Sequence, residues 1–190
     1  YDPPIGGAER SMHNYFSNIE DKYDIDVFCF LNDNGQRFKF TTNEIKDNIK
    51  IIKTSEDINQ CVNNYIHNNS PSVIGTQLLC SEQIVDMAYK NNIPVIYFAH
   101  GLFEDVCQHY LMTTCNETNL SVCKFGAHCP NASRHMVHQE KYSKCSKIFC
   151  NSLYTEKILK RFFPAESEKM VILPPNFRYD LFSPGIRSKE

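Results

Sequence analysis

The sequence has no tryptophan, no strong excess of charge of either sign, and no apolar run long enough to cross a bilayer. Its longest apolar runs, such as VIYFA at 95–99, have the length of β-strands. Twenty Lys and Arg residues stand against 22 Asp and Glu, which gives a formal net charge of −2. A nucleic-acid interface normally needs a strongly basic surface, so we expect no nucleic-acid partner.

Two short motifs are also missing from the 190 residues. The G-x-G-x-x-G fingerprint of nicotinamide-binding domains does not occur, which argues against a nucleotide-sugar epimerase or dehydrogenase. No C-x-x-C pair occurs either, although this spacing is typical of structural zinc sites. The first absence disfavours a redox enzyme of the nicotinamide type, and the second weakens the signal for a structural zinc site.

Cysteine, in contrast, is abundant, with nine residues. Five are scattered over apolar faces of the predicted elements, which favours a reducing, cytoplasmic environment. The other four lie 8, 8 and 6 residues apart: Cys107, Cys115, Cys123 and Cys129. Three alternatives stay open for this cluster, namely one structural zinc ion, two disulfides, or plain thiols. In a zinc site, His109 or His128 could take the place of one cysteine ligand.

Strand-like and helix-like segments alternate along the chain. Continuous apolar strands in such an alternation predict an α/β fold of the Rossmann-like type, a parallel sheet with helices on both faces. Serines at 55 and 81 are expected to cap the helices that follow them, and residues 101–130 form an irregular, cysteine-rich segment. The predicted strands are 24–31, 37–40, 48–54, 72–77, 94–100, 146–152 and 169–175, and the predicted helices are 8–20, 55–69, 81–92, 131–145 and 154–163.

Candidate binding residues follow from this pattern, because ligands of open parallel sheets bind beyond the carboxyl ends of the strands. His100 and Gly101 follow one predicted strand directly, and Asn151 follows another. Gly6 and Gly7 precede the first helix, where bare backbone N–H groups can approach a phosphate or a sugar hydroxyl. Ser152, next to Asn151, is expected to cap the helix at 154–163.

Several of these stretches resemble retaining glycosyltransferases of the GT-B fold, family-4 type. PPIGGAERSMHNYF (3–16) is similar to that family's first loop and helix, which typically reads P-x-x-G-G-A/V-E. PSVIGTQ and IPVIYFAHG resemble its middle strands, the second of which ends in the family's histidine. The passage from CSKIFCNS to NFRYDLFSP resembles its A-D-x-I-I-x-x-S…N-G-V-D-x-x-x-F-x-P segment, with NFRYD in place of the usual N-G-V-D.

The resemblance implies an acceptor-side Rossmann-like domain over residues 1–175 and the start of a linker at 176–190. It also implies that the first strand lies before Tyr1 and that a nucleotide-sugar-binding domain follows, so we expect the isolated chain to be inactive. The complete enzyme would transfer a sugar from a nucleotide-diphosphate sugar to a glycan, lipid or other acceptor, with retention of configuration and without a catalytic metal. In it, His100 would contact the donor sugar, while Gly6, Gly7, Gly101 and Asn151 would bind substrate.

Two further alternatives remain open. The chain could be a non-catalytic module that binds a glycan or a protein. Independently, the basic helix at 154–163 could touch an anionic membrane surface, or it could be a surface helix whose apolar stripe packs on the sheet.

Overall fold

The computed structural model describes two separate units of the chain. The first unit comprises Tyr1–Glu56 with Pro175–Glu190, and the second comprises Asp57–Pro174. The predicted domain boundaries at 175 and 176 stay a prediction. The described residues are 11–12, 14–16, 18–19, 21–30, 41–46, 49–54, 56–77, 81–100 and 139–175.

The first unit contains a three-stranded sheet. Strand β1 (Asp26–Phe30) pairs in parallel with β3 (Ile49–Thr54), and β2 (Thr41–Lys46) pairs with β3 in the antiparallel direction. The sequence predicts β1 and β3 but not β2, because TTNEIK has no apolar run and no regular alternation. The predicted strand at 37–40 lies outside the described residues. Residues 11–12 and 14–16 are helical, as the predicted helix at 8–20 requires.

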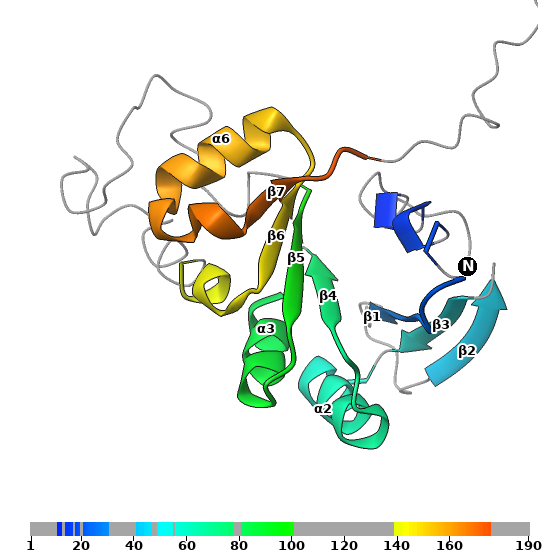
Figure 1. Ribbon diagram of the computed structural model, residues 1–190. Helices are drawn as coiled ribbons and strands as arrows, with labels where there is room; N and C mark the ends of the chain where they lie inside the picture. The colour runs from blue at the N-terminus through cyan, green and yellow to red at the C-terminus, as the bar shows by residue number, and fades with distance from the viewer. Residues whose placement is uncertain are drawn as a thin grey trace, which may run out of the picture. The chain divides into compact units, whose positions relative to one another are not determined.

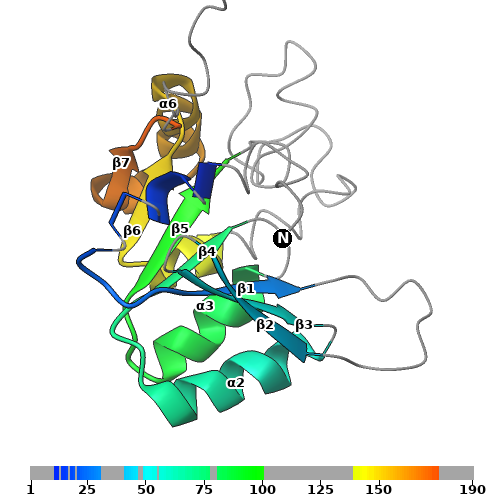
Figure 2. The ribbon, with the colours of Figure 1, turned by 90° about the vertical axis from the view of Figure 1, so that its right-hand side faces the viewer.

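The second unit contains a four-stranded sheet, shown with its helices in Figures 1 and 2. The strands follow the order β4-β5-β6-β7, and every pair is parallel. This confirms the α/β class, with a parallel sheet flanked by helices as in Rossmann-like folds. The elements are α2 (Ile58–Asn69), β4 (Ile74–Gln77), α3 (Ser81–Lys90), β5 (Val95–Ala99), β6 (Lys147–Cys150), α6 (Leu153–Phe162), the 3₁₀-helix η2 (Pro164–Lys169) and β7 (Met170–Ile172).

The starts of the helices correct two capping predictions and confirm another. Helix α2 is capped by Asp57, whose Oδ1 accepts a hydrogen bond from the N–H of Gln60 at 3.0 Å, so the prediction of Ser55 as the cap was wrong. Ser152 caps α6 as predicted. Ser81, also predicted as a cap, is instead the first residue of α3 itself, and its hydroxyl accepts a long hydrogen bond from Lys141 Nζ at 3.5 Å.

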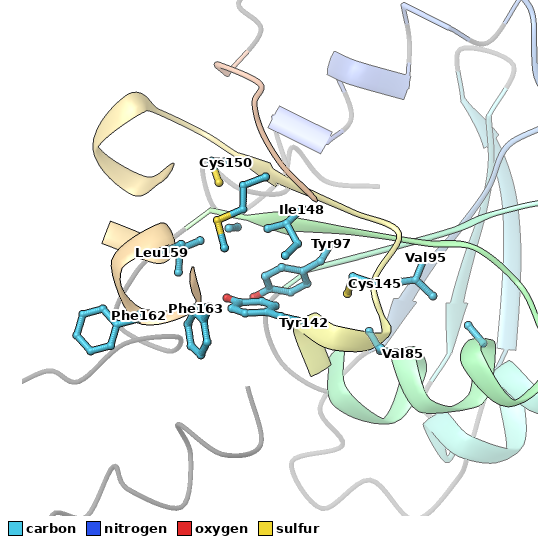
Figure 3. Close-up of a cluster of buried hydrophobic side chains, with 13 residues drawn as sticks. Val85, Val95, Tyr97, Tyr142, Cys145, Ile148, Cys150, Leu159, Phe162 and Phe163 are labelled. Atoms are coloured by element: carbon cyan, nitrogen blue, oxygen red, sulfur yellow. The ribbon is translucent and has the colours of Figure 1, made fainter. Parts of the chain in front are cut away.

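One face of this sheet carries the core, which Figure 3 shows in close-up. Side chains alternate between the two faces of a strand, so Val95, Tyr97 and Ala99 point to the same side. Helix α3, the helical segment 139–144 and α6 pack against them. The ring of Tyr142 lies between those of Tyr97 and Phe163, with centroid distances of 5.5 and 4.7 Å.

Helix α6 buries its apolar stripe in this core. Leu159 is completely buried and Phe162 is 6% exposed, while Ile158 packs against the cluster from its edge. The expectation that this stripe packs on the sheet is therefore confirmed. Within the described ranges, no helix combines the length and the apolar character that crossing a membrane would need.

Truncating a buried side chain of this stripe should lower the unfolding free energy of the second unit. Leu159→Ala leaves a cavity in a completely buried site, which costs about 2–5 kcal/mol of unfolding free energy. Leu153→Ala on the same helix is the matched control, because Leu153 is 52% exposed and its truncation should change stability by less than about 0.5 kcal/mol. Urea unfolding followed by circular dichroism measures both, and equal losses would contradict this packing.

Lys144 joins the helical segment 139–144 to α3. Its Nζ lies 2.6 Å from both Asp86 Oδ1 and Glu140 Oε1. The hydrogen bond to Asp86, followed by that to Glu140, raises the pKa of Lys144 above its ordinary value of 10.5. A raised folded-state pKa stabilises the fold fully below pH 10.5, and this contribution is lost as the pH rises through the raised pKa.

Lys144→Met should therefore remove part of the alkaline dependence of stability. Both carboxylates are well exposed, at 45% and 69%, so we expect a loss of about 0.5 kcal/mol at neutral pH. The difference in unfolding free energy between the wild type and the variant should shrink as the pH rises past 10.5. Urea titrations at a series of alkaline pH values test this, and a constant difference would contradict the assignment.

Candidate functional site

The carboxyl edge of the four-stranded sheet gathers polar residues from three neighbouring strands. Gln77 ends β4, His100 follows β5 directly, and Asn151 follows β6 directly. Because Ala99 pairs with Cys150 in parallel register, His100 and Asn151 come level just beyond the last paired residues. This is the edge at which ligands bind in open parallel sheets.

Asn151 ties this edge together through both ends of its carboxamide. Its Nδ2 donates to the carbonyl oxygen of His100 at 2.9 Å, and its Oδ1 accepts from the hydroxyl of Thr155 at 2.6 Å. The backbone N–H of Asn151 also donates to the carbonyl of Ala99 at 3.4 Å. One side chain thus connects the end of β5, the end of β6 and the first turn of α6.

The start of α6 supplies the second half of this network. The N–H of Thr155 donates to Ser152 Oγ at 3.1 Å, which is the N-cap bond. Thr155 has one hydroxyl proton, and it goes to the Asn151 carbonyl oxygen, which can only accept. In the 3.0 Å contact between the two hydroxyls, Ser152 is therefore the donor. Thr155 is 4% exposed, so these bonds are sheltered from water.

His100 rests on an aromatic surface on the second face of the sheet. Its ring stacks on Phe98 with a centroid distance of 6.3 Å and an interplanar angle of 9°. Phe98 in turn meets Phe149 edge to face at 5.3 Å. Gly75 makes room for this arrangement, because a Cβ there would come within 3.2 Å of Phe98 Cε2. The imidazole is half-buried and its Nε2 is buried.

Gln77 is the residue that the sequence analysis did not single out. Its side-chain Oε1 is buried and accepts no hydrogen bond in the part of the chain that the structure describes. A polar residue ending a predicted strand was the available signal, the same one that marks His100 and Asn151.

The other predicted site residues lie outside the described ranges: Gly6, Gly7, Gly101, Cys107, Cys115, Cys123 and Cys129. Their roles, including structural zinc, stay predictions. Among the residues that are described, no group of three or more His, Cys, Asp or Glu side chains is placed to hold a metal ion. Cys29, Cys61, Cys145 and Cys150 are thiols rather than disulfides.

The arrangement fits recognition of a polar, uncharged ligand. The carboxyl edge offers the imidazole of His100 and the carboxamide of Gln77, which can both donate and accept hydrogen bonds. Phe98 is 7% exposed and supports these two side chains from below, and Phe149 is half-buried. Comparison with models of known families finds none that matches the chain, and a search of curated proteins finds no relative.

Replacing Asn151 should loosen the edge without opening the core. Asn151→Ala removes two hydrogen bonds from partly buried partners, which costs about 1–3 kcal/mol and leaves the His100 carbonyl without this donor. Asn69→Ala is the matched control, because Asn69 makes one exposed bond to the Tyr65 carbonyl, and it should cost less than about 0.5 kcal/mol. Faster amide hydrogen exchange in β5 and α6 would report this loosening. Unchanged exchange rates in Asn151→Ala would contradict the role of Asn151 in connecting the two strand ends to α6.

Proposed function

We propose that this chain is the acceptor-side half of a retaining glycosyltransferase that uses a nucleotide-diphosphate sugar. The observation that carries the proposal is the position of His100, level with Asn151 at the carboxyl edge of a parallel sheet and held there through its carbonyl. The order of the motifs PPIGGAE, IPVIYFAHG and CSKIFCNS supports the same family.

In this proposal each residue at the edge has one task. Asn151 occupies the backbone carbonyl of His100, which leaves the imidazole as the group of His100 to contact the substrate. An imidazole N–H can donate to a sugar hydroxyl or to charge that develops as the sugar leaves its phosphate. The donor nucleotide is held mainly by a further domain, and the acceptor is a glycan, a lipid or another hydroxyl compound. Peripheral contact of the protein with an anionic membrane is a separate proposal, and it would be relevant if the acceptor is a lipid.

His100→Ala in the complete protein that contains this chain tests the proposal. Loss of one preorganised donor near the reacting sugar should lower kcat/KM for sugar transfer by about 10²–10³. His67→Ala is the matched control, since His67 is exposed in the last turn of α2 and should leave transfer unchanged. Transfer from radiolabelled UDP-, GDP- and ADP-sugars to a mixed acceptor pool is measured.

The outcomes separate the proposal from its alternative. Transfer that depends on His100 and retains the anomeric configuration supports the glycosyltransferase. Binding of a glycan without transfer from any donor would replace it with the non-catalytic binding module. Undiminished sugar transfer by His100→Ala would show that the His100 side chain is not needed for the reaction.

A further inference from the structure

Gln77 keeps a buried polar atom that the described fold does not use. Its Oε1 is shielded from solvent and has no hydrogen-bond donor within reach among the described residues. Leaving a buried acceptor without a partner costs stability, and most such atoms in folded proteins do have partners. Gln77 lies at the sheet edge where a ligand is predicted to bind. A hydrogen-bond donor on that ligand would supply the partner that Oε1 lacks, which gives a reason for keeping a residue that lowers stability.

The sheet places Gln77 on the same face as His100. Gln77 pairs with Phe98 in the parallel register of β4 and β5, so the two side chains leave the sheet on one side. The His100 ring stacks on Phe98, which shows that it lies on that side as well. Gln77 and His100 therefore flank the ring of Phe98 at the carboxyl edge.

The chemistry of this pair defines what it can bind. The buried Oε1 can only accept, so the ligand must bring an O–H or N–H group. The carboxamide's Nε2 can donate to a neighbouring oxygen of the same ligand. Adjacent hydroxyls on a sugar ring satisfy these two requirements together.

We infer that Gln77 is a sugar-binding residue, whose Oε1 accepts a hydrogen bond from a hydroxyl of the ligand and whose Nε2 donates to the next oxygen. This inference rests on the proposed function, and it adds a contact from β4 to that of His100. It makes Gln77 a residue that selects the arrangement of hydroxyls on the sugar.

Gln77→Leu tests the inference, because leucine has a similar size and no hydrogen-bonding atoms. The melting temperature of the chain should stay the same or rise, since a buried acceptor without a partner is removed. Gln83→Leu is the matched control, with the same change at an exposed position of α3, and it should leave both stability and binding unchanged.

The same variant identifies the Gln77 side-chain NH₂ signals, which disappear from its ¹H–¹⁵N spectrum. We expect these signals to shift when the wild-type chain is titrated with methyl α-D-glucopyranoside, methyl α-D-mannopyranoside or UDP-glucose. Affinity for the responding probe should fall about tenfold in Gln77→Leu, the equivalent of one hydrogen bond.

Either of two results would overturn the inference. A clear drop in melting temperature for Gln77→Leu would show that the side chain is structural, and signals that no probe shifts would show that it meets no sugar. Sugar transfer that depends on His100 but not on Gln77 would refute the sugar-binding role of Gln77 and support the glycosyltransferase proposal. Gln77 signals that respond to a sugar, in a complete protein that transfers none, would support the role of Gln77 and refute the glycosyltransferase proposal.

Discussion

The candidate site depends on one side chain, the carboxamide of Asn151. It connects two strand ends and a helix start through a 2.9 Å bond to the His100 carbonyl and a 2.6 Å bond from the Thr155 hydroxyl. Strand ends are otherwise free to fray, because the ladder of the sheet stops there. The stacking of the His100 imidazole on Phe98 adds a second contact that positions this residue.

The core on the other face gives this connection a rigid base. Helix α6 is anchored by Leu159, Phe162 and the adjacent Phe163, which are almost completely buried, and Thr155 in its first turn is 4% exposed. The two faces thus have separate tasks. Tyr97, Tyr142 and Phe163 hold the helices to the sheet, while Phe98 supports the polar edge on the opposite side.

The sequence predicted much of the second unit and less of the site. Continuous apolar strands such as VIYFA and stripes such as that of α6 predicted β5 and α6 to within a few residues, because burial leaves a periodic trace. Strand β2 was missed because its pairing with β3 is a tertiary effect on a polar segment. Ser152 was predictable as a local cap, whereas the bond from Asn151 to His100 spans 51 positions and leaves no local signal. The burial of Gln77 Oε1 is visible only once β4 and β5 are paired.

We propose that the carboxyl edge of β4, β5 and β6 binds a sugar. A crystal structure of the chain grown with UDP-glucose and with methyl α-D-glucopyranoside tests this proposal. We expect electron density for a sugar ring within hydrogen-bonding distance of the His100 imidazole and of Gln77 Oε1, with the Asn151 bonds intact. A sugar bound at the amino ends of these strands, or away from the sheet, would contradict it.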